Sequence, residues 1–480
     1  MADLLRDFAA AVARHPDRVA LIDGRGRQTS FGALRARSEA FAAAWQRKGI
    51  RPGHRVLLAM SVDADLYAAL AALWSLGATV VLPEPAMGLA GFRHAARVTR
   101  PEGFCSSGAF GLLKWVLPGL WGTMPLRPAS HPGPLRDAPG REVSGEDGSV
   151  ALISFTSGTG GAPKAIPRSH DFLDAQHRAV APLLESDRAD ERDLVAFPVF
   201  VLINLAAGRT SVLPNWRMSR IAALPPDRLR DWIERQGVTR ALIPPSLCEK
   251  LAVSGVPPQL DRVFTGGGPV FPDLVDRLRQ AAPHLRLTCV YGSTEAEPIA
   301  HLDTADLRAA DETAMDQGQG LLVGHPVAGI LLRIEKGEIQ VAGAHVNGGY
   351  LDPAQDAETK IREGGTLWHR TGDAGHLDGQ GRLWLLGRVG SEVEIDGQTV
   401  HPFSVEITVR RWPGVRNCAL MAEEGRAVLF IDGDAENARQ WQERAASLGI
   451  GRVIRVDRMP MDRRHASKID RKALRDWRGR

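Results

Sequence analysis

The sequence is poor in cysteine and in aromatic residues, and it carries almost no net charge. Its four cysteines are scattered over 480 residues without a C-x-x-C pair, so neither a disulfide scaffold nor a structural zinc site is predicted. Lys and Arg number 60 against 56 Asp and Glu, which leaves a formal charge of +4. No basic segment is interleaved with aromatic residues as in nucleic-acid-binding modules, and we expect no nucleic-acid partner.

A long hydrophobic run is also missing. The most apolar stretch, residues 66–82, is interrupted by Ser75 and Gly77. It predicts a buried helix that turns at Gly77 into a buried strand. The first eight residues include acidic side chains where a signal peptide needs a cationic start and an apolar core. These absences predict a cytoplasmic protein with no transmembrane segment.

Short apolar runs that alternate with amphipathic runs make up the first two thirds of the chain. The apolar runs end near Pro or Gly and predict buried strands at 55–60, 78–83, 240–246, 262–268 and 286–292. Helical patterns occupy 4–14, 31–48 and 272–282. This alternation predicts an α/β fold with a largely parallel sheet covered on both faces. Ligands of such sheets bind at the carboxyl ends of the strands.

After residue 320 the pattern changes to short antiparallel strands. The predicted elements are two strands within 331–343 joined at Lys336-Gly337, a strand in 381–388, two strands in 418–433 and a helix at 438–446. The polar segments 129–148 and 303–317 are predicted to be loops. We place a domain boundary between residues 387 and 388, which gives a large N-terminal α/β domain (1–387) that ends in a small β subdomain, and a small α+β C-terminal domain (388–480).

The segment richest in chemical groups follows an apolar strand at 151–155. Its glycines let the backbone approach a ligand, and its hydroxyl groups and lysine add donors for phosphate. The segment consists of Thr156, Ser157, Gly158, Thr159, Gly160, Gly161, Ala162, Pro163 and Lys164. Pro163 and Ala165 flank the lysine where G-x-x-x-x-G-K-[ST] requires Gly and Ser or Thr, so a P-loop kinase is disfavoured.

The order Thr-Ser-Gly-Thr-Gly-Gly-x-Pro-Lys resembles the phosphate loop of the adenylate-forming superfamily. That group includes acyl-CoA synthetases, adenylation domains of nonribosomal peptide synthetases and firefly-type luciferases. Gly160 stands where the family usually has Thr, and Ala165 where it usually has Gly. The resemblance implies that the whole loop, from Thr156 to Lys164, binds the phosphates of ATP.

Two further blocks follow in the order that the family shows. The segment Gly266, Gly267 and Gly268 resembles the family's glycines beside adenine. The run Tyr291, Gly292, Ser293, Thr294 and Glu295 resembles its Y-G-x-T-E block. By this resemblance Tyr291 stacks on adenine, Thr294 contacts phosphate and Glu295 holds Mg²⁺. These roles agree with the preference of a purine for a flat apolar face and of a hard cation for carboxylate oxygen.

The remaining blocks resemble the family's T-G-D segment and its C-terminal lysine. Asp373 would accept hydrogen bonds from both ribose hydroxyls, and Arg388 would donate to the ribose or to phosphate. Lys468 would neutralise the charge that builds up during adenylation; its alternative role is that of one more cation in a basic tail. The resemblance thus names Lys164, Glu295 and Lys468 as catalytic, ATP and Mg²⁺ as cofactors, and the C-terminal domain as a mobile lid.

The sequence departs from the thioester-forming members at one informative position. Those members usually carry a histidine in a P-x-x-H loop, and Val201 stands at that position within 197–208. The apolar segment 197–208, the T-G-D run and the Lys468 segment with its trailing Trp477 are all similar to the β-lactone synthetases of bacterial olefin biosynthesis. Such enzymes adenylate a 3-hydroxy acid whose own hydroxyl then attacks the activated carbonyl.

Three functions remain open on the sequence alone. An AMP-forming ligase that passes a hydrophobic acyl group to a thiol, on CoA or a carrier protein, is favoured because this activity is the most frequent. A β-lactone synthetase that cyclises a 3-hydroxyacyl-AMP is the alternative. A non-catalytic nucleotide-binding homologue is the third, and the presence of Lys164, Glu295, Asp373 and Lys468 disfavours it.

Overall fold

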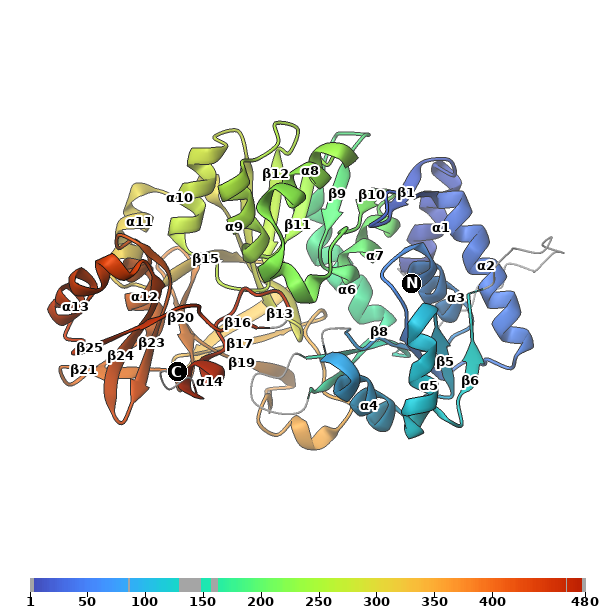
Figure 1. Cartoon of the computed structure of the whole chain (residues 1–480). Coiled ribbons are helices and arrows are strands. Elements are labelled where there is room, and N and C mark those ends of the chain that lie inside the picture. Colours follow the sequence, from blue (N-terminus) through green and yellow to red (C-terminus); the bar gives the residue numbers. More distant parts are fainter. Residues whose placement is uncertain (1–3, 85–86, 129–147, 157–162, 463, 477–480) are drawn as a thin grey trace. The chain divides into compact units, whose positions relative to one another are not determined.

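A computed structural model describes residues 4–84, 87–128, 148–156, 163–462 and 464–476 of the chain (Figure 1). Contacts within the chain divide it into two compact units. Unit 1 comprises Met1–Arg220, Asp231–Ile243 and Ala344–Ala357. Unit 2 comprises Ile221–Arg230, Pro244–Gly343 and Glu358–Arg480.

One sheet of unit 1 has the strand order β6-β5-β3-β4-β7-β8. Its strands are β3 (Arg55–Ala59), β4 (Thr79–Val81), β5 (Gly103–Ser106), β6 (Met124–Leu126), β7 (Val150–Phe155) and β8 (Ala165–Ser169). All neighbours are parallel except β7 and β8, which form an antiparallel pair. The carboxyl ends of β3, β4, β5 and β7 therefore lie at one edge of this sheet.

A second sheet of unit 1 joins β2, β1, β10, β9 and β11 in that order. The strands are β1 (Val19–Ile22), β2 (Gln28–Ser30), β9 (Arg192–Val195), β10 (Thr210–Val212) and β11 (Arg240–Ile243). Only the pair of β1 with β2 is antiparallel. Predominantly parallel strands need helical crossovers, which the sequence supplies between them.

Helices cover both faces of the first sheet. On β3, Val56 and Leu58 pack into one core cluster, whereas Leu57 and Ala59 pack into another. Since successive strand residues point to opposite faces, β3 is buried on both sides. The helices of this part of the chain are α1 (Leu4–Arg14), α2 (Phe31–Arg47), α3 (Ala64–Ser75), α4 (Gly88–Thr99), α5 (Leu113–Val116), α6 (His170–Val180) and α7 (Pro198–Ala206), with 3₁₀ turns η2 (Gly108–Leu112), η3 (Pro118–Leu120) and η4 (Ala181–Leu184).

Unit 2 contains a mixed sheet and a separate three-stranded sheet. The mixed sheet has the order β12-β13-β14-β15-β20-β19-β17-β16, with β18 beside β19. Its strands are β12 (Arg262–Gly266), β13 (Arg286–Ser293), β14 (Ala296–Asp303), β15 (Leu321–Pro326), β16 (Ile330–Glu335), β17 (Glu338–Gly343), β18 (Lys360–Glu363), β19 (Thr366–Leu377) and β20 (Leu383–Arg388). Only β12 and β13 among these pairs are parallel.

The last 90 residues of the chain form their own sheets and core. Strands β23 (Val415–Glu423), β24 (Arg426–Gly433) and β25 (Arg452–Val456) make one sheet, and β21 (Val393–Ile395) pairs with β22 (Gln398–Val400). Trp441 and Leu429 are fully buried in the accompanying core. The helices of the later chain are α8 (Pro226–Gln236), α9 (Pro245–Ser254), α10 (Pro272–Ala281), α11 (Ala309–Asp316), α12 (Pro402–Arg410), α13 (Ala438–Ser447) and α14 (Arg471–Asp476), with 3₁₀ turns η5 (Met218–Ala223), η6 (Thr304–Asp306), η7 (Pro353–Gln355) and η8 (Ala435–Asn437).

The predicted fold class is confirmed: parallel sheets covered by helices precede an antiparallel β region and a small α+β C-terminal part. Segment 66–82 is the helix-turn-strand that the sequence predicts, with Gly77 in a left-handed conformation (φ 68°). All four cysteines are buried free thiols. Among the described residues, no helix combines the length and the apolar character that crossing a membrane requires.

One predicted loop is wrong. Segment 303–317 contains the turn η6 and the helix α11, not an irregular loop. The helix begins with a reciprocal cap in which the Arg308 backbone N–H donates to Asp311 at 3.1 Å. The buried Asp311 carboxylate also accepts a hydrogen bond from Arg382 at 2.8 Å. Because ion pairs and a cap, rather than an apolar stripe, stabilise α11, hydrophobic periodicity gave no signal for it. The other predicted loop, 129–148, falls almost entirely outside the described residues.

A buried ion pair between β9 and β11 generates a test of the fold. Arg240 is 2% exposed and donates to both carboxylate oxygens of Asp193, at 2.8 and 2.9 Å, and it also contacts Glu191. Replacing Arg240 by Met leaves two carboxylates buried without their main cation. We expect Arg240→Met to lower the free energy of unfolding by about 3–5 kcal/mol, measured by urea denaturation.

The matched control is Arg439→Met. Arg439 and its partner Glu443 have 92% and 64% of their side chains exposed, so this change should cost less than about 0.5 kcal/mol. Equal unfolding midpoints for the two variants would contradict the assignment of Arg240 as a structural cation.

Candidate functional site

A single carboxylate joins three strands of unit 2. Asp373 on β19 accepts a hydrogen bond from the Tyr291 hydroxyl of β13 at 2.7 Å, through Oδ2. Its other oxygen, Oδ1, accepts from Nη1 of Arg388, the last residue of β20, at 2.8 Å. The structure therefore brings together three residues that the sequence places 82 and 15 positions apart.

The local sequence fixes this carboxylate in place. Thr371 Oγ1 donates to the Ile339 carbonyl at 2.8 Å and accepts from the Asp373 backbone N–H at 3.0 Å. Gly372 adopts a left-handed conformation with φ 70°, and a Cβ there would lie 2.6 Å from the Arg388 guanidinium. Glycine is thus required both for the left-handed backbone within β19 and for the close approach of Arg388.

The cluster is partly shielded from solvent, which changes its titration. Burial, followed by the negative charge of Asp373, raises the pKa of the Tyr291 hydroxyl well above its usual value. Tyr291 therefore remains a neutral hydrogen-bond donor at physiological pH. Partial burial would lower the pKa of Arg388, but the Asp373 carboxylate outweighs it and raises that pKa, with a smaller contribution from Glu295. A charged guanidinium and a neutral phenol thus donate one hydrogen bond to each oxygen of the Asp373 carboxylate.

The residues after Tyr291 turn at the end of β13. Ser293 is the last residue of this strand, and Thr294 and Glu295 follow in the turn to β14. All three are half-buried. The Ser293 hydroxyl oxygen is buried and has no hydrogen-bond partner among the described residues. A buried polar group without a protein partner is uncommon and fits a position that a polar ligand completes.

A loop built on Asp462 carries the C-terminal lysine. The carboxylate of Asp462 accepts four backbone N–H groups: those of Arg464 and His465 on one oxygen, and those of Ser467 and Lys468 on the other, at 2.8 to 3.0 Å. Burial opposes ionisation of Asp462, yet these N–H groups outweigh it and lower the pKa of the carboxyl. The Lys468 side chain itself is exposed. The backbone that presents this lysine is thus fixed by one residue.

The Asp462 loop contacts the glycine segment within unit 2. Gly266 ends β12 and Gly267 has a left-handed φ of 79°. A Cβ on Gly268 would meet the Ser467 Cβ at 2.6 Å, so only glycine fits beside the lysine loop.

The same loop also reaches two other parts of unit 2. Ser246, near the start of α9, donates through Oγ to the His465 carbonyl at 2.5 Å. Arg464 donates to Thr294 Oγ1 at 3.4 Å. The predicted glycine segment, the Y-G-S-T-E block and the lysine loop are therefore neighbours in this unit.

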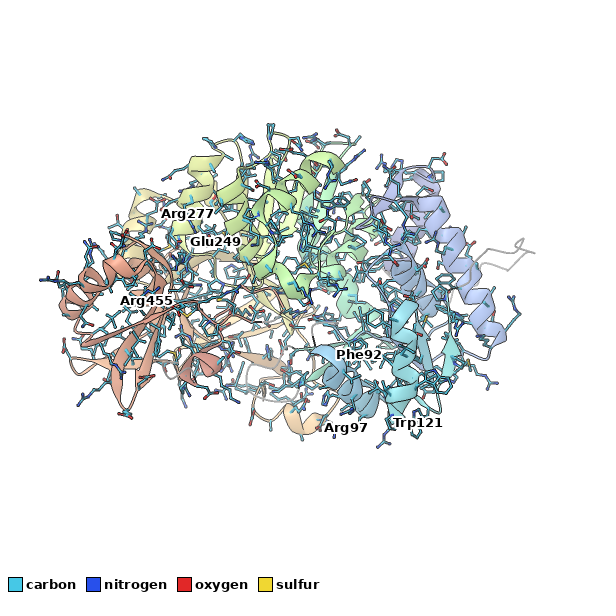
Figure 2. All side chains as sticks on the ribbon, viewed as in Figure 1. Phe92, Arg97, Trp121, Glu249, Arg277 and Arg455 are labelled. Atoms are coloured by element: carbon cyan, nitrogen blue, oxygen red, sulfur yellow. The ribbon has the colours of Figure 1, made fainter. Side chains whose placement is uncertain are left out.

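Charged side chains of the three helices α9, α10 and α12 connect the C-terminal part of the chain to the rest of unit 2. The buried Arg410 of α12 donates to both oxygens of Asp273 on α10, at 2.7 and 3.0 Å, and approaches Glu249 of α9 at 3.4 Å. Glu249 also pairs with Arg277 at 2.6 Å, and Figure 2 labels both residues. Since Arg410 belongs to residues 388–480 and its partners to residues 1–387, this ion cluster links the two predicted domains.

The phosphate-loop segment lies in unit 1, between β7 and β8. Ser157, Gly158, Thr159, Gly160 and Gly161 lie outside the described residues. The stem of the loop is closed by two hydrogen bonds between Thr156 and Lys164: Thr156 N–H to the Lys164 carbonyl at 3.0 Å, and Lys164 N–H to Thr156 Oγ1 at 3.1 Å. The Lys164 ammonium lies 4.7 Å from the centre of the Tyr350 ring, a cation–π contact. This lysine is therefore oriented before any ligand arrives.

Val201, which by the family resemblance stands where thioester-forming members usually have a histidine, lies on α7. Val201 is fully buried in the main core of unit 1. Asn204, the one polar residue of this helix, is also fully buried and donates to Ser211 Oγ on β10 at 3.0 Å. α7 therefore presents no group that could accept or donate a proton to a substrate.

Several residues were not predicted from the sequence. Tyr350 orients Lys164, Asp462 shapes the lysine loop, and Arg464 adds a second cation near Thr294. For Tyr350 the signal was the aromatic residue that ends the N-G-G-Y run. Asp462 and Arg464 gave no signal, because a carboxylate that binds its own backbone looks in sequence like any surface acid.

The described residues could hold Mg²⁺ through one carboxylate together with phosphate oxygens of a substrate. Among them, no group of three or more His, Cys, Asp or Glu side chains is arranged to bind a metal. Glu295 is the carboxylate nearest the Thr294 turn, and it acts electrostatically on Arg388. Mg²⁺ commonly binds through one or two carboxylates together with substrate phosphates, and this donor set suits that mode.

Comparison with known proteins agrees with this geometry. Residues 8–351 match the model of the AMP-binding enzyme family. The olefin β-lactone synthetase of Stenotrophomonas maltophilia is 30% identical, over 93% of this chain and 90% of the relative. That of Xanthomonas campestris pv. campestris is also 30% identical, over 98% and 97%. An amide bond synthetase from Marinactinospora thermotolerans shares the fold, with a TM-score of 0.81 and 23% identity over 99% of both chains.

The Asp462 loop yields a prediction that needs no ligand. Asn in place of Asp462 keeps the shape but offers one acceptor oxygen for four N–H groups. We expect Asp462→Asn to speed hydrogen exchange of the amides at 464–468 at least about tenfold. A loss of about 1.4 kcal/mol in the local stability of the loop is enough to raise the exchange rate tenfold. The measurement is hydrogen–deuterium exchange with mass spectrometry.

Asp457→Asn is the control, because Asp457 is 87% exposed and pairs only with Arg455, itself 39% exposed. In the Asp457→Asn variant, the amides at 464–468 should exchange at the wild-type rate. Unchanged protection in Asp462→Asn would show that the loop is held by other contacts.

Proposed function

Because the chain belongs to the AMP-binding enzyme family, whose members form adenylates, we propose that it activates a hydrophobic 3-hydroxy carboxylic acid as acyl-AMP and closes this intermediate to a β-lactone. In the first step the acid's carboxylate attacks the α-phosphorus of ATP, and pyrophosphate leaves. In the second step the 3-hydroxyl oxygen attacks the activated carbonyl. The new C–O bond closes the four-membered ring, the bond from the carbonyl carbon to the AMP oxygen breaks, and AMP leaves with the hydroxyl proton.

The residues of unit 2 would bind the nucleoside. Each oxygen of Asp373 accepts a hydrogen bond, one from Tyr291 and one from Arg388, so the carboxylate can exchange those donors for ribose hydroxyls. The neutral phenol of Tyr291 offers an apolar ring face to adenine. Ser293 and Thr294 supply hydroxyl groups at the adjacent turn, where the Ser293 hydroxyl lacks a protein partner among the described residues. Gly266, Gly267, Gly268 and Gly292 would leave room for the base.

The two lysines and Glu295 would act on the phosphates. Lys164, oriented by Tyr350, would bind phosphate from the phosphate loop. Lys468, presented by the Asp462 loop, would neutralise the charge that grows as the carboxylate attacks. Mg²⁺ held by Glu295 would supply further positive charge to the phosphates. We assign residues 1–387 to nucleotide binding and residues 388–480 to a lid that carries Lys468.

The proposal that the second step is lactone formation rests on the side chains of α7. Val201 is buried at the position where the resemblance expects a histidine, and Asn204 is a fully buried amide whose Nδ2 donates to Ser211. A thiol would therefore find no base on this helix. A 3-hydroxyl is already attached to the activated acid, and its high effective concentration replaces that assistance. The 30% identity to two olefin β-lactone synthetases over nearly the whole chain supports the same product.

A thiol ligase is the second candidate. Its support is the frequency of acyl-CoA formation among adenylate-forming enzymes, and CoA or a carrier protein would be the acceptor. It needs the thiol to react with acyl-AMP without the usual histidine. We place it second for that reason.

Products decide between the two candidates. A 3-hydroxy fatty acid is supplied with ATP, Mg²⁺ and excess CoA, and the products are identified by mass spectrometry. We expect β-lactone and AMP in equal amounts, formed at the same rate when CoA is omitted. Acyl-CoA as the main product, with turnover that requires CoA, would overturn the proposal in favour of the ligase.

Lys468 provides a separate test of the first step. Lys468→Ala should reduce ATP–pyrophosphate exchange at least about a hundredfold, because its charge acts mainly in the transition state. ATP binding, measured by calorimetry, should change much less. Lys472→Ala is the control, since Lys472 is an exposed lysine four residues along the same basic segment. Equal exchange rates in the two variants would remove Lys468 from the catalytic residues.

A further inference from the structure

One described stretch of unit 1 holds the whole charge excess of the protein. Residues 87–128, the described segment between two undescribed ones, contain five basic residues and one acidic residue. The basic residues are Arg93, Arg97, Arg100, Lys114 and Arg127, and the acid is Glu102. The chain as a whole has 60 basic and 56 acidic residues, so the rest of it has 55 of each and is neutral. Basic residues are as frequent in this stretch as in the whole chain, so its positive excess comes from the scarcity of acidic residues that could neutralise them.

The same stretch exposes large apolar side chains. Ten large hydrophobic residues are exposed in the described chain, and five of them lie here. They are Leu89 (48% exposed), Leu112 (66%), Trp115 (80%), Val116 (54%) and Trp121 (64%). Exposing both tryptophans is costly in water, and a cluster of this kind usually marks an interaction surface. We call these five residues, together with Arg93 and Arg97 of α4 and Arg100 directly after it, the 87–128 surface.

The elements of this surface pack against one another. Gly119 of η3 lies so close to α4 that a Cβ there would be 3.3 Å from the Ala96 Cβ. Phe92 and Ala96 of α4 share a core cluster with Leu117 and Leu120. Trp121 follows η3 directly, and Figure 2 places Trp121 and Arg97 at the same edge of unit 1. The apolar anchors and the cations therefore belong to one rigid piece of the protein.

The cations on and after α4 are not neutralised by the protein itself. Leu89, Arg93 and Arg97 follow each other at helical spacing and are exposed, and the exposed Arg100 caps the end of the helix. In the part of the chain that the structure describes, none of these three arginines forms an ion pair with an acidic side chain. Arg97 contacts only His94, at 3.3 Å. These arginines are free to meet external negative charge.

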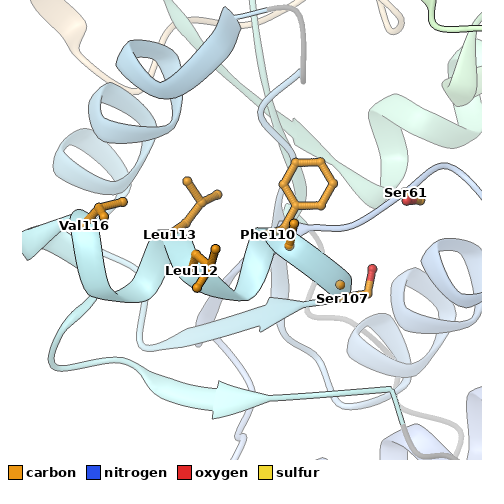
Figure 3. Close-up of a pocket in the computed structure, with 8 residues that line it drawn as sticks. Ser61, Ser107, Phe110, Leu112, Leu113 and Val116 are labelled. Carbon is orange, nitrogen blue, oxygen red and sulfur yellow. The ribbon is translucent and has the colours of Figure 1, made fainter.

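An apolar cavity opens within the same surface. It has a volume of about 460 Å³ and is lined mainly by Phe110, Leu112, Leu113 and Val116, with Ser61 and Ser107 at the carboxyl ends of β3 and β5. Figure 3 shows the four apolar side chains on consecutive turns of η2 and α5. Because Leu112 and Val116 belong to both the cavity wall and the exposed cluster, the cavity is continuous with the surface.

We propose that the 87–128 surface docks the enzyme onto an anionic lipid bilayer. Exposed Trp side chains favour the level of the lipid headgroups, and aliphatic side chains reach the acyl boundary. Arginines around them bind the negative headgroups. The cavity beside Leu112 and Val116 accommodates part of one acyl chain. The protein lies on the membrane and does not span it, which agrees with the absence of a membrane-spanning helix among its described elements. This surface is independent of which product the enzyme makes.

The test is vesicle co-sedimentation of the full-length protein. Vesicles of phosphatidylcholine with phosphatidylglycerol should bind it at least about tenfold more tightly than phosphatidylcholine alone. Raised salt should weaken that binding, because it screens the arginines. Trp115→Ser/Trp121→Ser should lose at least tenfold of the affinity, and Arg93→Gln/Arg97→Gln should lose the preference for anionic vesicles.

Val253→Ser/Leu331→Ser is the matched control, since Val253 and Leu331 are 73% and 55% exposed outside this surface. It should bind vesicles as the wild type does. ATP–pyrophosphate exchange with a short water-soluble acid should be unchanged in all these variants, which shows that they are folded. Sedimentation velocity without lipid shows whether a second copy covers the surface instead.

Three results would overturn the proposal. The first is wild-type protein that does not bind anionic vesicles. The second is a Trp115→Ser/Trp121→Ser variant that binds them as well as the wild type. The third is a wild-type protein that is a dimer and does not bind vesicles, together with a Trp115→Ser/Trp121→Ser variant that is a monomer. That result would assign the surface to a second copy of the chain.

Discussion

The carboxylate of Asp373 is the group on which the candidate nucleotide site of unit 2 depends. Its two oxygens accept hydrogen bonds from Tyr291 within β13 and from Arg388 at the end of β20. Thr371 and the left-handed Gly372 fix the part of β19 that carries it. Because the cluster is partly shielded, an unpaired carboxylate there would be costly. The same hydrogen bonds that stabilise the fold therefore hold in place a group whose two oxygens could accept from a diol.

A second carboxylate, that of Asp462, fixes the backbone that carries the long and flexible side chain of Lys468. A lysine has many rotamers, so its catalytic use requires at least its backbone to be fixed. Four backbone N–H groups bound to Asp462 provide that, while the Lys468 ammonium stays in solvent. The Arg410 cluster with Asp273 and Glu249 ties the same C-terminal part to α9 and α10. Charged groups, not apolar packing alone, thus position the lysine for which we propose a catalytic role.

Much of the fold and part of the site could be predicted from the sequence. The alternating apolar runs predicted the parallel strands, because a strand such as β3 is buried on both faces and is therefore apolar at successive positions. Ordered motifs identified Tyr291, Asp373 and Arg388, which the structure brings into contact. Helix α11 was missed because ion pairs of Asp311 stabilise it. Asp462 and Tyr350 were missed because their roles depend on contacts with the backbone and with Lys164, which no sequence pattern encodes. The roles of the site residues in catalysis remain predictions.

The central claim is that the carboxylate is activated and the hydroxyl attacks it. A 3-hydroxy acid labelled with ¹⁸O in both carboxylate oxygens tests this directly, with mass spectrometry of both products. Attack of the hydroxyl on acyl-AMP sends one label into AMP and leaves the other in the lactone carbonyl, with an unlabelled ring oxygen. Lactone that keeps both labels beside unlabelled AMP would mean that the hydroxyl is activated and the carboxylate displaces it, and that result would contradict the account.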